Sequence, residues 1–175
     1  MRGRQSYRET IRDRIAETAL KLMEQKKFDE IKIEEIMEIA GFTKGTFYQY
    51  FDRKESLWQH IVDSALEKFR MMLTDAEESA SDAEKALDIL ISSVMREKEH
   101  SPQLWRIFAR AIAEEETLRK RLIDRLIAFI FMFGGQATFE GASVLLGTFI
   151  CIWIERSPMD GEKLKKFLHN AVFCA

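Results

Sequence analysis

Cysteine is scarce in this chain of 175 residues, which contains only Cys151 and Cys174. Two distant cysteines form neither the disulfide framework of a small secreted protein nor a spaced set of metal ligands. The histidines His60, His100 and His169 are scattered, and no serine, cysteine or carboxylate pair stands in a recognisable catalytic arrangement. We therefore expect a cytoplasmic protein that is not an enzyme and holds no metal and no cofactor.

Proline and glycine are also few, at two and eight residues. Alanine, glutamate, lysine, leucine and isoleucine are abundant, and the alternation of apolar and polar residues that is typical of strands is scarce. Apolar residues make up 46% and charged residues 32% of the chain, which is enough to build a core and argues against disorder. The composition predicts an all-α protein and argues against a sheet-based enzyme fold.

Long hydrophobic runs are absent. The longest, Val144 to Ile154, is too short to span a bilayer and is interrupted by Gly147 and Thr148. The basic first residues lead into a charged amphipathic helix, so we expect neither a signal peptide nor a membrane partner. The net charge of -2 argues against a protein that coats nucleic acid through bulk electrostatics, so any nucleic-acid site must be local.

The helical spacing of apolar residues predicts about nine helices, and we expect them to form two modules, residues 1–53 and residues 54–175. We expect the first three helices at about residues 7–25, 34–40 and 44–50. Gly41 should end the second as a left-handed residue, and the Thr43 hydroxyl should cap the third. Further helices should begin at about residues 52, 81, 101, 117, 139 and 160. Residues 74–80 are expected to form a surface loop, and residues 81–84 a capping box.

The most informative segment is residues 40–51, AGFTKGTFYQYF. Its phenylalanines, Phe42, Phe47 and Phe51, can share one side of the third helix and hold it against the first two. The other side then carries a lysine, a glutamine and several hydroxyls, with no acid between residues 43 and 51. Lysine suits a phosphate or the acceptor edge of guanine, Gln49 suits adenine, and the hydroxyls suit phosphates. This pattern indicates a helix-turn-helix reader of DNA.

Together with Lys54-Glu55, this segment resembles the signature of the TetR (tetracycline-repressor) family of bacterial transcription regulators, over about residues 8–57. The resemblance implies that Lys44, Gly45, Tyr48 and Gln49 face the major groove. It also implies that the DNA backbone is held by Thr43, Thr46, Tyr48, Tyr50 and Lys54. Lys32 stands where family members commonly have threonine; lysine cannot cap the second helix, although its charge can reach DNA.

The second module supplies candidate residues for dimerisation and for a ligand pocket. The helix beginning at residue 139 is apolar nearly all round, so it needs cover from its own domain and from a second subunit. The candidate interface residues are Val144, Gly147, Thr148, Cys151, Leu164, Phe167 and Leu168. The resemblance also implies an effector, here apolar or aromatic, and the candidate pocket residues are Phe69, Met72, Trp105, Phe108, Phe129, Met132 and Phe133. Residues of these types at helical spacing are also typical of an ordinary core.

The sequence thus indicates a bacterial transcriptional regulator, a ligand-responsive repressor that binds a palindromic operator as a homodimer. A plain helical hairpin with a solvated face explains less well the glycine in the first turn and the local lack of acids. The alternative function is a helical protein-interaction module or co-regulator that has lost DNA binding.

Overall fold

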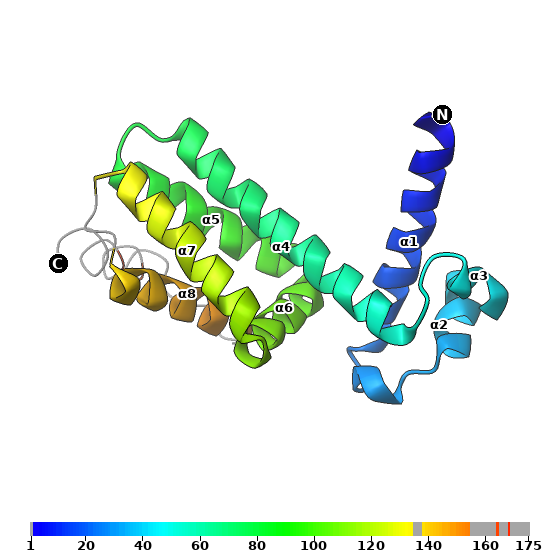
Figure 1. The fold of residues 1–175 in the computed structure, drawn as a ribbon. Helices are drawn as coiled ribbons and strands as arrows, with labels where there is room; N and C mark the ends of the chain where they lie inside the picture. Colours follow the sequence, from blue (N-terminus) through cyan, green and yellow to red (C-terminus); the bar gives the residue numbers. More distant parts are fainter. Residues whose placement is uncertain (1, 135–137, 155–163, 165–167, 169–175) are drawn as a thin grey trace. The chain divides into compact units, whose positions relative to one another are not determined.

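A computed structural model of the chain describes residues 2–134, 138–154, 164 and 168, and of residues 2–9 only the backbone. The described residues form helices and no strands, which confirms the all-α prediction. The elements are α1 (Arg2–Leu22), the 3-10 helix η1 (Phe28–Glu30), α2 (Ile33–Ala40), α3 (Lys44–Tyr48), α4 (Lys54–Ser79), α5 (Ala83–His100), α6 (Pro102–Glu114), α7 (Glu116–Met132) and α8 (Phe139–Ile154) (Figure 1). The predicted ninth helix lies outside the described residues, except for Leu164 and Leu168, which are helical and buried.

The chain divides into two compact units, residues 1–64 and residues 65–175. The division falls inside α4, so the first turns of this helix belong to the first unit and the remainder to the second. The sequence had placed the boundary at the start of this helix. No described helix is apolar over a stretch long enough to cross a bilayer, and the described side chains bring no three potential metal ligands together.

The core of the first unit forms where α1, α2 and α3 meet, because each of these helices buries one apolar stripe. Ile15 of α1, Ile36 of α2 and Phe47 of α3 are each fully buried. Each such side chain contributes about 1.5–3 kcal/mol relative to leaving it in water. Gly41 ends α2 with φ +79°, as predicted. That left-handed conformation strains any residue with a Cβ, which explains glycine at this turn.

The end of α4 differs from the sequence prediction, because the helix continues through residues 74–79 where a surface loop was expected. Leu73 and Ala76 are fully buried, so the apolar stripe continues beneath the acidic surface. The last turns are also held by an ion pair between Arg125 Nη1 and Glu77 Oε1, 2.6 Å apart. The acidic composition was therefore misleading, since it marks a solvated face of a helix.

The start of α5 also corrects the sequence prediction of a capping box opened by Ser81. The N-cap is Asp82, whose carboxylate accepts a hydrogen bond from the Lys85 backbone N–H at 2.8 Å. The Ser81 hydroxyl donates to the same carboxylate at 2.8 Å. These bonds stabilise the ionised form, so the pKa of Asp82 is lowered.

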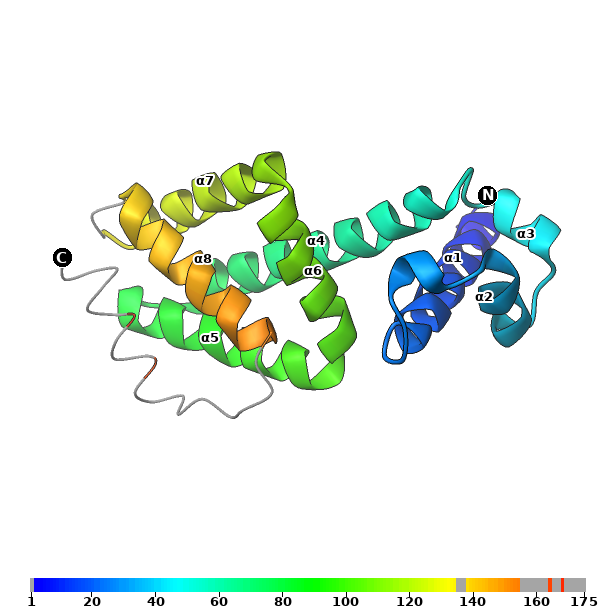
Figure 2. The same ribbon diagram turned by 90° about the horizontal axis from the view of Figure 1, so that it is seen from below.

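The second unit surrounds a core of aromatic side chains. Figure 2 shows α8 between α5 and α7, with α6 beside its C-terminal end, and all three helices are neighbours of α8 in space. Trp105 and Phe108 of α6, Trp153 of α8 and Phe69 of α4 are almost completely buried. Their rings contact one another, so three helices that are distant in the sequence, α4, α6 and α8, share a single cluster.

His60 of α4 makes the first unit sensitive to pH. Its ring lies 5.6 Å from that of Phe51, and its Nε2 atom lies 3.6 Å from Asp13 Oδ1. Burial, followed by the nearby Arg12 charge, lowers the pKa of His60, while Asp13 and Asp63 oppose the shift. The folded chain therefore takes up this proton less readily than the unfolded chain, and stability is lost as pH falls from about 6.5 toward the folded pKa.

We expect the free energy of unfolding to fall between pH 7.5 and pH 5.5, and to fall less in a His60→Gln variant. Urea denaturation at the two pH values measures both losses. Glu34 and Glu35 have lowered pKa values, so their contribution is lost only below their ordinary pKa of about 4.5 and does not enter this window. An equal loss in the two proteins would contradict the assignment to His60.

Candidate nucleic-acid interface

The helix α3 is held in place from behind by two phenylalanines. Phe47 and Phe51 are buried, and their ring centroids lie 5.4 Å apart. Phe42, in the turn before α3, is only half-buried, with the Arg14 guanidinium 5.4 Å from its ring centre. The Phe42 N–H also donates to the Met37 carbonyl at 2.8 Å, which ties the turn to α2.

The opposite side of α3 is open to solvent. Lys44, Gly45 and Gln49 are exposed, and half of the surface of Tyr48 is accessible. Thr46 and Tyr50 are partly exposed at the edges of this surface. An ammonium, an amide and a phenol thus lie on one short helix, where they can meet base edges and phosphates.

Thr43 and Lys32 occupy the N-cap positions of α3 and α2, and neither caps through its side chain. The predicted cap by the Thr43 hydroxyl is wrong. Its Oγ1 atom instead lies 3.0 Å from Thr46 Oγ1, within hydrogen-bonding distance. Lys32 is exposed. Both side chains are on the surface of the helix-turn-helix.

Lys54 is engaged inside the first unit. Its ammonium donates to the Phe28 backbone carbonyl and lies 4.6 Å from the centre of the Phe28 ring. These contacts fasten the first turn of α4 to η1. To contact a phosphate, as the resemblance implies, the side chain would have to leave both partners.

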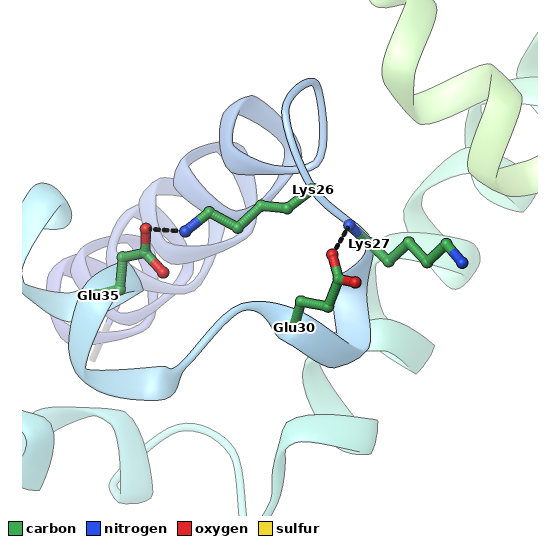
Figure 3. A network of polar contacts seen from close by, with 4 residues as sticks. All are labelled: Lys26, Lys27, Glu30 and Glu35. Atoms are coloured by element: carbon green, nitrogen blue, oxygen red, sulfur yellow. Dashed lines mark hydrogen bonds and ion pairs between the residues drawn. The ribbon is translucent and has the colours of Figure 1, made fainter.

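The segment between α1 and α2 is ordered by two further polar contacts (Figure 3). The Lys26 ammonium pairs with Glu35 of α2, with 2.6 Å between Nζ and Oε1. The Lys27 backbone N–H donates to the Glu30 carboxylate at 3.0 Å. The first of these contacts connects the segment after α1 with the first turn of α2, so it helps to fix the helix that precedes the turn.

Glu34 is a charged residue of this surface that sequence reasoning missed. Its Oε1 atom lies 2.5 Å from Lys44 Nζ, so an acid from α2 reaches the surface of α3. The hydrogen bond and charge of Lys44 lower the pKa of Glu34, and the same interaction raises the pKa of Lys44. Residues 43–51 contain no acid, but the partner lies ten positions upstream of Lys44, outside that segment.

The candidate pocket residues of the second unit do not all gather in one place. Phe69, Trp105 and Phe108 belong to the buried aromatic cluster, and Met72 and Phe129 are also buried. Phe133 is half-buried, with its ring 5.4 Å from that of Phe129. Met132 is exposed on the surface.

The aromatic cluster contains two residues of α8 that the sequence assigned to no pocket. The Trp153 ring stacks on the Trp105 ring, with centroids 5.0 Å apart and planes 20° apart. Phe149 packs edge-on against Phe69 at 5.7 Å. Both indole N–H groups are buried without a hydrogen-bond partner. A buried donor that lacks a partner costs about 1–3 kcal/mol.

One face of α8 is apolar and exposed. It carries Val144, Gly147, Cys151 and Ile154, while the half-buried Thr148 donates its hydroxyl to the Val144 carbonyl at 2.8 Å. The opposite face of the helix is buried within the unit. Of the other candidate interface residues, Leu164 and Leu168 are buried within the single chain, and Phe167 lies outside the described residues.

Comparisons with known proteins point to one family. Residues 15–61 match the family described as "Bacterial regulatory proteins, tetR family". Over 90 residues the chain is 36% identical to the HTH-type transcriptional regulator EthR of Mycolicibacterium smegmatis, a match that covers 49% of this chain and 42% of that protein. The chain thus spans less than half the length of this curated relative. The curated relatives that match are named as transcriptional regulators.

Solved structures share the fold over nearly the whole chain. A TetR-like transcriptional regulator from Rhodococcus sp. RHA1 has a TM-score of 0.74 at 16% identity, covering 94% of this chain and 92% of that one. The superantigen PfiT has a TM-score of 0.69 at 17% identity, covering 94% of this chain and 97% of that one. Likeness at such low identity shows the fold alone.

We expect a Lys54→Met variant to lose about 1–2 kcal/mol of stability, because it removes the hydrogen bond to the Phe28 carbonyl and the contact with its ring. Thermal or urea denaturation measures this loss. Arg53→Met, a neighbouring change on an exposed side chain, is the matched control. Equal stability of the two variants would show that the Lys54 contacts contribute nothing to folding.

Proposed function

We propose that this chain, whose residues 15–61 match the tetR family of bacterial regulatory proteins, is a member of that family and a repressor that binds a palindromic operator as a homodimer. In this proposal a small molecule bound in the second unit releases the operator. The chain acts in the cytoplasm, where the operator is. The alternative, an interaction module that has lost DNA binding, leaves the exposed polar side of α3 without a role.

The observation that carries the proposal is the two-sided construction of α3. Its buried side is phenylalanine, and its solvent side presents Lys44, Tyr48 and Gln49. Because the superantigen PfiT shares the fold, the fold alone does not argue for DNA binding. The side chains on the open surface do, since each matches a group of the major groove or the phosphate backbone.

The exposed face of α8 supports dimerisation. Val144, Gly147, Cys151 and Ile154 follow one another at helical spacing and carry no charge. A second copy of the same face would cover them in a twofold-symmetric contact. Two copies of α3 would then read two half-sites, separated by about 34–36 Å or a multiple of that distance.

The buried aromatic cluster supports an effector site. Its rings favour an apolar molecule, and the unpartnered indole N–H groups of Trp105 and Trp153 favour one with a neutral oxygen acceptor. If such a molecule lowers the affinity for operator, linkage requires operator to lower the affinity for the molecule by the same factor.

A double variant, Lys44→Ala with Tyr48→Ala, tests operator binding. A duplex selected with the wild-type protein from a random library serves as the operator. We expect the double variant to bind it at least about tenfold more weakly, because it lacks the groups that reach bases and phosphates. Fluorescence anisotropy over a range of salt concentrations measures the affinity and its salt dependence.

Both substituted side chains are exposed, so the melting temperature should change little. Sedimentation of the wild-type complex should give an even number of chains per duplex. If no sequence is enriched from the library, or the double variant binds as tightly as the wild type, DNA reading by α3 is wrong.

A matched pair of probes tests the effector site. Methyl ketones of six to ten carbons present a carbonyl oxygen, and the corresponding 2-methylalkenes replace it with a methylene group. We expect some ketone of the series to bind about fivefold more tightly than its alkene, since one hydrogen bond contributes about 1 kcal/mol. A Trp58→Phe background leaves only Trp105 and Trp153 to report binding by fluorescence.

In that background, Trp153→Phe and Trp105→Phe keep an aromatic ring and remove one N–H each. At least one of them should abolish the preference for the ketone while still binding the alkene. Binding of neither probe, or a ketone preference that survives both substitutions, would contradict an acceptor site at the indole pair.

A further inference from the structure

The ion pair between Glu34 and Lys44 places a negative charge on the proposed DNA-binding surface. We propose that Glu34 is a specificity-determining residue: it holds the Lys44 ammonium in the free protein and thereby weakens binding to non-operator DNA more than binding to operator. This inference rests on the proposed function, and it concerns a residue outside the segment that carries the DNA-reading groups.

The contact joins two helices across the turn. Glu34 lies in the first turn of α2, Lys44 is the first residue of α3, and 2.5 Å separates their Oε1 and Nζ atoms. About half of each side chain is exposed, 53% for Lys44 and 57% for Glu34. The pair is thus accessible to DNA, and either member can exchange its partner.

Glu34 and its neighbour Glu35 have different partners. Glu35 pairs with Lys26, which lies in the segment that connects α1 to α2 (Figure 3). Glu34 pairs with the recognition surface instead. Of these two acids of α2, only Glu34 is therefore bonded to a group that we expect to contact DNA.

Both members of the pair are ionised at neutral pH. The hydrogen bond from Lys44 lowers the pKa of Glu34, and the carboxylate raises the pKa of Lys44. The nearby Lys32 charge favours the carboxylate in the same way. A change of pH near neutrality therefore does not separate the Lys44 ammonium from Glu34. Only a competing hydrogen-bond acceptor does.

A phosphate is a poor competitor for this ammonium. It would replace one anionic acceptor with another, and the freed carboxylate would remain close to the negatively charged backbone. In the major groove, by contrast, both Lys44 and Glu34 can replace each other with a new hydrogen-bond partner. Guanine N7 and O6 accept from lysine, and the amino group of a cytosine or adenine donates to a carboxylate. A base step with both groups therefore satisfies Lys44 and Glu34 together, whereas the DNA backbone satisfies only Lys44.

A Glu34→Gln variant tests the inference, with two duplexes as probes: the one selected with the wild-type protein and a shuffled duplex of the same composition. We expect the variant to bind the shuffled duplex about three- to tenfold more tightly, with a salt slope steeper by about one per released lysine. Affinity for the selected duplex should rise less or fall, so the ratio of the two affinities should decrease.

Glu38→Gln is the matched control, because Glu38 is an exposed glutamate of the same helix and its substitution changes the net charge equally. It should alter binding to the two duplexes by the same small factor. In a Lys44→Ala background, Glu34→Gln should have no larger effect than this control. Melting temperatures of all variants verify that they are folded.

Two results would overturn the inference. One is an unchanged affinity ratio in Glu34→Gln, and the other is an equal effect of Glu34→Gln with and without Lys44, which would mean that Glu34 acts only through general charge. The failure of the proposed function is distinguishable from both. In that case the wild-type protein enriches no duplex, and Lys44→Ala changes nothing.

Discussion

The burial of Phe47 of α3 and Phe51, just after it, against the rest of the first unit is the interaction on which the proposed DNA-binding surface depends. A helix of five residues is far too short to be stable by itself in water. It exists here because burial of these two rings and the bond from Phe42 to α2 fix its backbone. The polar side chains on the other face are thereby held in one orientation, which is the condition for reading bases.

The positive charges near this surface are few, and neighbouring residues engage some of them. The chain as a whole is slightly acidic, so it has little general attraction for nucleic acid. Two of the lysines near the helix-turn-helix are occupied within the unit, Lys44 by Glu34 and Lys54 by the Phe28 carbonyl. Such engagement favours partners that offer more than negative charge. Under the proposed function, the slightly acidic chain and the ion pair of Lys44 thus both weaken binding to DNA that offers only negative charge.

Local signals predicted the elements well and their ends less well. The glycine turn, the proline at the start of α6 and the buried phenylalanines of α3 follow from rules that act within a few residues. The end of α4 did not, because its acidic turn is held by contacts with the rest of the unit: Leu73 and Ala76 are buried beneath it, and Glu77 pairs with Arg125 of α7. The N-cap of α5 is Asp82, one residue after the predicted Ser81, since either of these adjacent polar residues could serve as a cap.

The sequence by itself determined the helical class, the place of the helix-turn-helix and the residue types on its open side, because periodicity and turn chemistry are local properties. Only the tertiary structure decided which distant groups meet. It brought Glu34 to Lys44, Lys54 to the Phe28 carbonyl and Trp153 onto Trp105. These contacts depend on how helices pack across turns and loops, and no local pattern specifies which of several acids, carbonyls or rings will be the partner.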